Sequence, residues 1–171
     1  LAFAFGQLWW GLTQPFAGAV ADRIGTGRVI LLGVALVAVG TVLTPLMTST
    51  VGLILAIGVL AAGGAGMAGP SVLMAAASRL VPPEKRGLAT GIVNAGGSFG
   101  QFIMAPIAGG LMLALGWASA MQVLGLIVLL ALPAAFVLRG NSLQAAPAGQ
   151  KVVGTREAIR TAVRDRNFLL L

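Results

Sequence analysis

The charged residues of this chain are confined to three short zones, and the stretches between the zones carry no charge at all. The two longest uncharged stretches run for 50 and 52 residues. The uncharged stretches are residues 1–21, 29–78 and 87–138. The 11 basic and 4 acidic residues fall in residues 22–28, 79–86 and 139–166. This pattern is typical of a chain that crosses a lipid bilayer several times, because charges inside the hydrocarbon region are costly.

The lengths of the uncharged stretches predict how many times the chain crosses. A helix of 50 residues would be about 75 Å long, whereas the hydrocarbon core is about 30 Å thick. Each long stretch must therefore form two helices with a turn between them, marked by Pro45 in one case and Gly116 in the other. The predicted spans are residues 3–21, 28–47, 51–77, 87–113 and 118–138. The expected fold class is all-α, a polytopic membrane helix bundle with five transmembrane helices.

The composition supports this class and indicates an orientation. The chain is 58% hydrophobic and 9% charged, against about 25% charged in a typical soluble domain. With five spans, all three charged zones lie on one face of the membrane, and their net charges are +1, +2 and +4. The positive-inside rule places them in the cytoplasm, so we expect a multi-pass protein of the plasma (inner) membrane. Nucleic acid is not an expected partner, because the basic residues occupy loops rather than a polar face.

Several kinds of chemistry lack the residues that they need. The chain has no Cys and no His, and the predicted spans contain no ionisable residue apart from Arg28 at the first position of the second span. We therefore expect no enzyme activity, no catalytic residues, no metal site and no cofactor. A proton relay or a positive partner for an anion would have to come from outside these spans.

A motif begins at the end of the first predicted span and continues into the loop that follows. Residues 18–28 read Gly-Ala-Val-Ala-Asp-Arg-Ile-Gly-Thr-Gly-Arg. Asp22 and Arg23 fall where a helix ends, Gly18 would let a neighbouring helix approach closely, and Gly25 and Gly27 would allow positive φ in the turn. An ordinary cytoplasmic loop with an ion pair is one interpretation, and it is the alternative to the functional one that follows.

The same string resembles the signature loop of the major facilitator superfamily, between its second and third helices. In that family the Asp and Arg form a cytoplasmic latch that breaks when the carrier opens inward. The resemblance implies that the latch residues here are Gly18, Asp22, Arg23, Gly25 and Arg28. The chain departs from the family pattern where Thr26 and Gly27 replace the usual pair of basic residues, which weakens the charge part of the latch.

The resemblance also assigns the remaining parts of the chain. Residues 1–138 would be the transmembrane N-terminal half, from helix two to helix six, without helix one. Residues 139–166 would be the cytoplasmic central loop, and residues 167–171 would open helix seven. A cationic helix expected over residues 155–166 is either a solvated linker near lipid headgroups or a partner site. The partners would be a small solute, the lipid bilayer and the missing C-terminal half of the same chain.

Within the superfamily, two stretches are similar to one branch. Residues 63–66 read Gly-Gly-Ala-Gly, and residues 85–92 read Lys-Arg-Gly-Leu-Ala-Thr-Gly-Ile. With Pro70 and Arg79, they resemble the monocarboxylate-transporter-like and oxalate/formate-antiporter-like branch. That resemblance implies transport of a small organic anion by alternating access. The alternatives are an efflux carrier for drugs or amphipathic cations, and a non-transporting membrane receptor or assembly protein.

Polar side chains inside two spans are candidates for the lining of a solute cavity. Four of them recur at i, i+4, i+8 and i+11 in the fourth span, so they share one helical face. Three others recur at i, i+3 and i+7 in the first span. The candidates are Thr90, Asn94, Ser98 and Gln101, with Gln7, Trp10 and Gln14. A hydrogen-bonded seam between helices is the alternative for the first set, and simple packing or lipid contact for the second.

Small residues recur every four positions in the third span, which is the spacing that lets helices approach backbone to backbone in lipid. Pro70 in this span is expected to kink the helix. The residues expected to serve helix packing are Ala61, Ala65, Gly66, Gly69, Pro70, Gly109 and Gly110.

Overall fold

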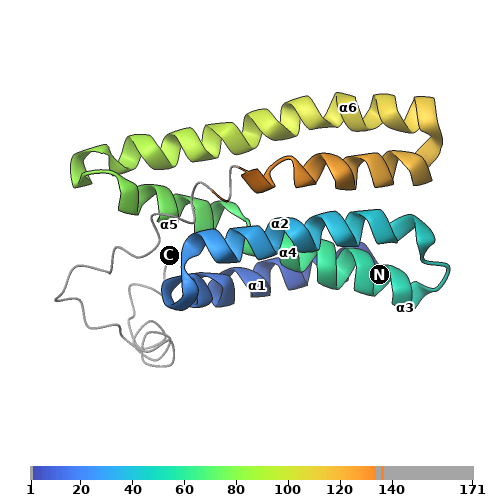
Figure 1. Cartoon of the computed structure of the whole chain (residues 1–171), viewed down its shortest axis with the longest axis horizontal. Helices are drawn as coiled ribbons and strands as arrows, with labels where there is room; N and C mark the ends of the chain where they lie inside the picture. The colour runs from blue at the N-terminus through green and yellow to red at the C-terminus, as the bar shows by residue number, and fades with distance from the viewer. Residues whose placement is uncertain (1, 134–135, 137–171) are drawn as a thin grey trace.

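The computed structural model describes residues 2–133 and 136, and all regular structure in this part of the chain is helical (Figure 1). The helices are α1 (Ala2–Ile24), α2 (Thr26–Leu43), η1 (Thr44–Leu46), α3 (Thr50–Leu53), η2 (Ile54–Ala61), α4 (Ala62–Met67), α5 (Pro70–Leu80), η3 (Pro83–Lys85) and α6 (Arg86–Leu129). Here η1 and η3 are 3₁₀ turns and η2 is a π-helix. The expected central loop and the start of helix seven lie outside the described residues.

Three helical segments in the described part are long and apolar enough to cross a membrane. They are Thr26–Leu46, Thr50–Ser78 and Pro83–Leu129. The last has 47 residues and would be about 70 Å long as one straight rod. It is bent back on itself at Gly116, whose φ of 75° and ψ of 164° are not helical. The all-helical fold is confirmed, whereas the number of five spans stays a prediction, because the first predicted span forms α1 but is not among these three segments.

The turns of the bundle lie at two opposite ends (Figure 1). The α1–α2 turn and the α5–α6 connection share one end, and the charged residues of the described part lie in or beside them. The turn after η1 and the reversal at Gly116 share the other end. The α1–α2 turn is a single residue, Gly25, and its φ of 97° is readily adopted only by glycine.

The third membrane-length segment is interrupted rather than continuous. Ser49 caps its start by accepting a hydrogen bond from the Gly52 backbone N–H at 3.0 Å. The helix ends at Met67, Gly69 is extended with φ −72° and ψ 170°, and Pro70 begins α5. A single helix over residues 51–77, kinked at Pro70, was predicted, but the segment is two helical stretches separated by a break at residues 68–69. Proline lacks a backbone N–H, so it is favoured in the first turn of a helix and disfavoured in the interior of one.

The closest packing lies where α2 crosses η2 and α4. A Cβ atom on Gly33 would lie 2.7 Å from the Gly64 carbonyl oxygen, and one on Gly64 would lie 2.5 Å from that of Gly33. Two helical turns further along α2, a Cβ on Gly40 would lie 2.6 Å from the backbone nitrogen of Ala61. No side chain fits at such distances, so these helices touch through their backbones. Ala61, one of the residues expected to serve helix packing, lies at this contact.

The other predicted packing residues fall in different surroundings. Gly66 lies against α1, since a Cβ there would be 2.9 Å from the Cβ of Thr13 and 3.0 Å from the Trp10 carbonyl oxygen. A Cβ on Gly69 would meet only the preceding turn of its own segment, at the Ala65 carbonyl oxygen. Gly109 and Gly110 would meet no atom of the described residues within 4 Å. The expected close packing at these two glycines is absent from the described part of the chain.

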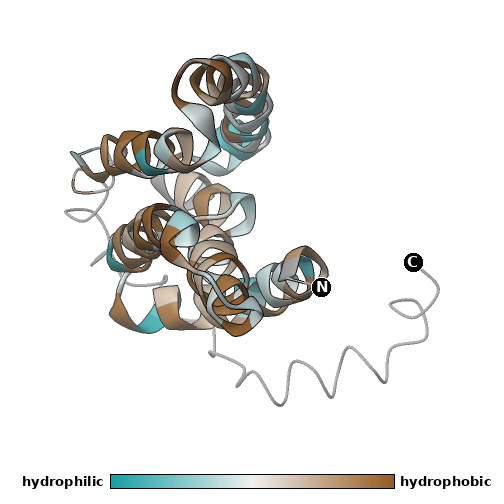
Figure 2. Cartoon of the chain, turned by 90° about the vertical axis from the view of Figure 1, so that its right-hand side faces the viewer, coloured by the Kyte–Doolittle hydropathy of each residue, from teal (hydrophilic) through white to brown (hydrophobic). Residues whose placement is uncertain are grey.

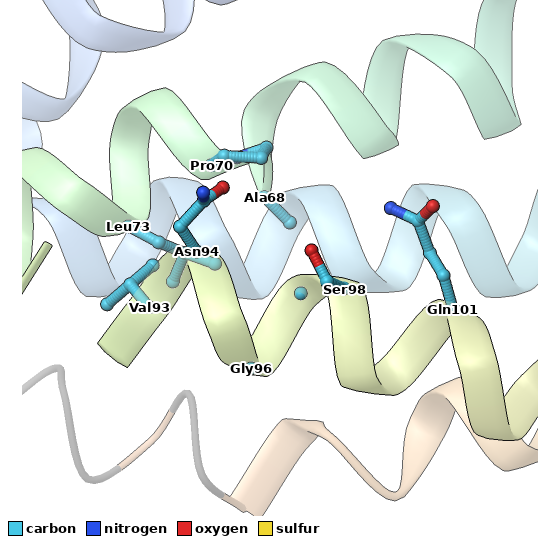
Figure 3. Close-up of a pocket in the computed structure, with 9 residues that line it drawn as sticks. Ala68, Pro70, Leu73, Val93, Asn94, Gly96, Ser98 and Gln101 are labelled. Carbon is cyan, nitrogen blue, oxygen red and sulfur yellow. The ribbon is translucent and has the colours of Figure 1, made fainter. Parts of the chain in front are cut away.

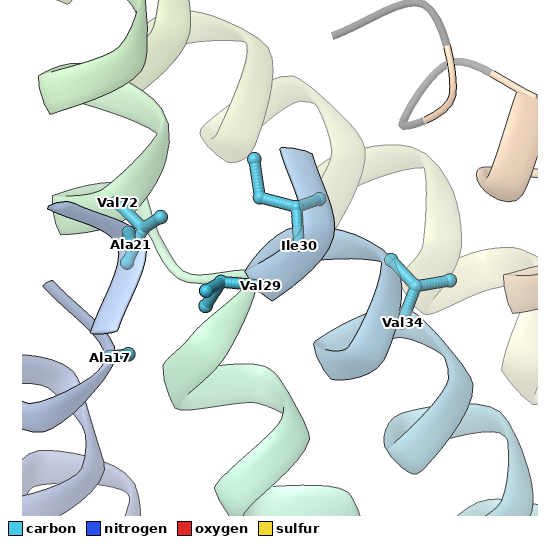
Figure 4. Close-up of a cluster of buried hydrophobic side chains, with 6 residues drawn as sticks. All are labelled: Ala17, Ala21, Val29, Ile30, Val34 and Val72. Carbon is cyan, nitrogen blue, oxygen red and sulfur yellow. The ribbon is translucent and has the colours of Figure 1, made fainter. Parts of the chain in front are cut away.

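A small apolar cluster joins α1, α2 and α5 near the charged end of the bundle (Figure 4). Its members are Ala17, Ala21, Val29, Ile30, Val34 and Val72. Val29 has no exposed surface, and Val72 is the contribution of α5. The cluster fixes the short turn at Gly25 between its two helices.

Many large apolar side chains of the described residues are exposed, and Figure 2 shows that hydrophobic residues occur along all the long helices. Among the three membrane-length segments, 39%, 28% and 11% of the most apolar window is buried, in chain order. Large side chains such as Phe99 and Phe102 on α6 are 64% and 75% exposed. Exposing an apolar surface of this extent to water is energetically unfavourable, whereas lipid chains can cover it at no such cost.

Candidate functional site

A pocket of about 540 Å³ lies between α6 and the break that separates α4 from α5 (Figure 3). Asn94, Ser98 and Gln101 project into it from one face of α6, as their spacing predicted. Ala68, Pro70 and Leu73 form the opposite wall. We call this space the larger pocket; Val93, Gly96 and Gly97 complete its lining.

The larger pocket exists because two features of the backbone leave room. A Cβ atom on Gly96 or Gly97 would meet nothing within 4 Å, so these glycines replace side chains that would fill the space. On the other wall, the extended backbone at Gly69 displaces α5 from the line of α4. Every residue that lines the pocket is uncharged, and three of them offer amide or hydroxyl groups.

Thr90 is the member of the predicted stripe that does not line the larger pocket. Its hydroxyl donates to the carbonyl oxygens of Arg86 and Gly87, each at 3.0 Å, within its own helix. This is the usual way for a helical threonine to satisfy its hydroxyl. Of the four stripe residues, three share the pocket and Thr90 does not.

A second, smaller pocket of about 120 Å³ lies between α1 and α5. Its polar lining is Gln14, Asp22, Thr26 and Ser71. Gly18, Ala21, Val72 and Ala75 complete it. The Ser71 hydroxyl donates to Gln14 Oε1 at 2.6 Å, which joins two helices 57 residues apart in sequence. Gln14 therefore belongs to the smaller pocket rather than to the one lined by Asn94.

The other two candidates on α1 line neither pocket. The side chain of Gln7 is exposed, and Trp10 is 37% exposed. The neighbouring Trp9 stacks on Phe5, with ring centroids 6.3 Å apart. The structure thus divides the predicted cavity residues among the larger pocket, the smaller pocket and the outer surface of α1.

The predicted latch residues surround the end of α1. Asp22 and Arg23 are exposed in its last turn, and Arg28 is exposed in the first turns of α2. The positive φ expected at Gly25 is present. At Gly27 it is not, because Gly27 is buried inside α2. No described residue approaches Gly18 closely as expected, since a Cβ there would meet none of their atoms within 4 Å; Gly18 instead lines the smaller pocket beside Asp22.

Comparison with protein-family models matches residues 1–171, the entire chain, to the Major Facilitator Superfamily. The chain belongs to the major facilitator superfamily. A search of curated proteins found no match. A major facilitator protein is a multi-pass membrane transporter of small solutes, which agrees with the apolar helices described above.

This membership fits the chemistry of the two pockets. Superfamily members are transporters, which move a solute across the membrane without changing its covalent bonds. Within the described residues, no group of three or more His, Cys, Asp or Glu side chains is placed to hold a metal ion. The polar groups in this part of the chain are amides, hydroxyls and the charged residues near the α1–α2 turn and the α5–α6 connection.

Sequence reasoning missed Ser71, the residue that bonds to Gln14. The available signal was a lone hydroxyl directly after Pro70, in a segment otherwise made of apolar and small residues. Such a polar group inside a span needs a partner, because lipid offers none. The identity of the partner depends on how α1 and α5 are rotated, which the sequence spacing of α1 alone does not specify.

Proposed function

We propose that this major facilitator protein carries a small organic anion, such as a monocarboxylate, by alternating access, and that the larger pocket forms part of the solute path. The observation that carries the proposal is the set of Asn94, Ser98 and Gln101 facing one space in an otherwise apolar bundle. Amide and hydroxyl groups can donate hydrogen bonds to a carboxylate. The resemblance of residues 85–92 to the monocarboxylate and oxalate/formate branch supports the same solute class.

The lining of the larger pocket contains, among the described residues, no charged residue of either sign, so it does not by itself separate an anion from an amphipathic cation. A cation of that kind is usually recognised by a carboxylate or an aromatic wall. No residue that lines this pocket in the described part is acidic or aromatic. The resemblance of residues 85–92 to the monocarboxylate and oxalate/formate branch ranks the anion first. Drug or cation efflux is the second candidate for transport, and a non-transporting receptor or assembly protein is the third.

The charge of the anion needs a positive partner that these pockets do not supply. We propose that the partner lies in helix one or in the second half of the carrier, across a site near the bilayer midplane. The protein would sit in the plasma membrane with the two charged connections of the described part in the cytoplasm. Their position at one end of the bundle supports this orientation.

We further propose that Asp22, Arg23 and Arg28, with Gly18 and Gly25, form the cytoplasmic latch. Their position around the end of α1 supports the assignment. A latch at this end would hold the carrier closed toward the cytoplasm and break when it opens inward.

Uptake into proteoliposomes tests the proposed solute. The carrier containing this chain would be reconstituted and supplied with radiolabelled monocarboxylates, with protein-free liposomes as the control. We expect saturable uptake that unlabelled carboxylates inhibit. Uptake of cationic drugs that no carboxylate affects would replace the proposed solute with the second candidate. The absence of any saturable flux would favour the third.

A further inference from the structure

α5 lies between the two pockets and forms a wall of each. Pro70 and Leu73 line the larger pocket, whereas Ser71, Val72 and Ala75 line the smaller one. The side chains alternate in this way because Pro70 and Leu73 occupy one helical face and Ser71 and Ala75 the next. Any displacement of α5 as a rigid helix would therefore change both pockets together.

The hydrogen bonds of α4 do not extend to the start of α5. Ala68 has φ −96° and ψ 12°, and Gly69 is extended, so the hydrogen-bonded ladder of α4 does not continue into α5. A few residues at the end of an element are the usual place where a hinge absorbs a change in backbone angles. Gly69 lies at such a place, directly before the first turn that carries Ser71.

The attachment of α5 to α1 depends on few contacts. Val72 packs into the cluster with Ala17 and Ala21, and the Ser71 hydroxyl donates to Gln14 Oε1 at 2.6 Å. Ala17 and Ala21 are small, so the apolar part of this contact has little area. The hydrogen bond is the directional contact, and it crosses the smaller pocket two helical turns, about 12 Å, before Asp22.

We propose that the Ser71–Gln14 hydrogen bond is a clasp that holds α5 on α1, and that its release lets α5 pivot at Gly69 and reshape the larger pocket. The proposal rests on the proposed function, because it makes α5 the link between the solute and the latch. Ser71 and Gln14 are positioning residues here, and neither contacts the solute. Gln14 is thereby reassigned from solute binding to the closing of the smaller pocket.

Cysteine labelling tests the clasp without any solute. The chain contains no Cys, so Thr26→Cys in the lining of the smaller pocket introduces one reporter thiol, once cysteines elsewhere in the carrier have been replaced. Ser71→Ala should increase the labelling rate by a water-soluble maleimide about threefold, the typical effect of one interhelical hydrogen bond in a membrane protein. Ser71→Thr keeps the hydroxyl and should restore the original rate.

A matched control lies on the same helix. The Ser78 hydroxyl donates to the Ala75 carbonyl oxygen at 2.9 Å within α5, so Ser78→Ala removes a hydroxyl without removing a bond between helices. Ser78→Ala should leave the labelling rate unchanged. Adding Gln14→Ala to Ser71→Ala should produce no further increase, because both changes remove the same bond. Equal labelling rates for Ser71→Ala and Ser78→Ala, or additive effects of Ser71→Ala and Gln14→Ala, would overturn the clasp.

Transport kinetics separate the clasp from the proposed solute. Once a transported solute is known, Ser71→Ala should change kcat and leave KM within about twofold, because the clasp affects the movement of α5 rather than solute contacts. A rise in KM with kcat unchanged would instead make Ser71 a binding residue and overturn its positioning role. If the carrier transports no carboxylate but the labelling rates behave as expected, the proposed solute fails and the clasp stands.

Discussion

The α2–α4 crossing and the first arm of α6, residues 86–115, use the same residue for opposite purposes. At the crossing, Gly33 and Gly64 remove side chains so that two backbones can touch. On α6, Gly96 and Gly97 remove side chains and nothing takes their place, so a pocket remains. A glycine-rich membrane helix therefore indicates either a tight contact or an open space, and only the neighbouring helix decides which.

The largest expected effect is at the tight crossing. In Gly64→Val, the new Cβ would lie 2.5 Å from the Gly33 carbonyl oxygen, so the helices would have to separate. Overpacking of a close contact costs about 1–3 kcal/mol or more, and backbone atoms have less freedom to yield than side chains. We expect a lower melting temperature in detergent and a poor yield of monodisperse protein by gel filtration.

The matched control for this change is Gly97→Ala on α6. A Cβ at that position would meet nothing within 4 Å, so the yield should be unchanged and the melting temperature should be equal to or slightly above that of the unaltered protein. If Gly64→Val and Gly97→Ala destabilised the protein equally, the contrast between the two regions would be wrong.

The next largest effect is expected at the proposed latch. Asp22→Asn keeps the shape of the side chain and removes its charge, so membrane insertion should be unaffected. A charge-assisted hydrogen bond is typically worth about 1.5–3 kcal/mol, and its loss should reduce transport roughly tenfold or more. Expression level in isolated membranes and initial uptake rates would measure the two quantities. An unchanged uptake rate at normal expression would remove the latch assignment.

An intermediate effect is expected in the larger pocket. Gln101→Ala and Asn94→Ala each remove a group that faces the pocket, and the loss of about 1 kcal/mol of hydrogen bonding should raise KM roughly fivefold. Thr90→Ala is the control from the same stripe, because the Thr90 hydroxyl already bonds within its own helix. Concentration-dependent uptake would measure KM for the three variants. Identical KM values would support a seam between helices in place of a solute pocket.

The sequence predicted the helices well because the signals that end them are local. Gly25, Pro45 and Gly116 mark turns through the conformations that proline and glycine allow or forbid, and no distant contact is needed to recognise them. The interruption at Gly69 was harder to predict, since a proline inside an apolar segment is compatible with either a kink or a full break.

The arrangement of the polar residues could be predicted only in part. The helical period placed Asn94, Ser98 and Gln101 on one face correctly, because that relation lies within one helix. The same reasoning assigned Gln14 to the solute cavity, although its hydrogen-bond partner is Ser71 on α5. The assignment depends on the rotation of one helix against another, which is set by packing contacts such as those of Gly33 and Gly66.

The smallest expected effect concerns Gly109 and Gly110, which were predicted to pack but have open space beside them in the described part of the chain. A glycine inside a helix is about 0.5–1 kcal/mol less favourable than alanine, because it loses more conformational freedom on folding. If nothing packs on this face of α6, Gly109→Ala and Gly110→Ala should raise the melting temperature slightly in the complete carrier. A lower melting temperature would show that another helix contacts these glycines closely, and the first arm of α6 would then resemble the α2–α4 crossing in this region.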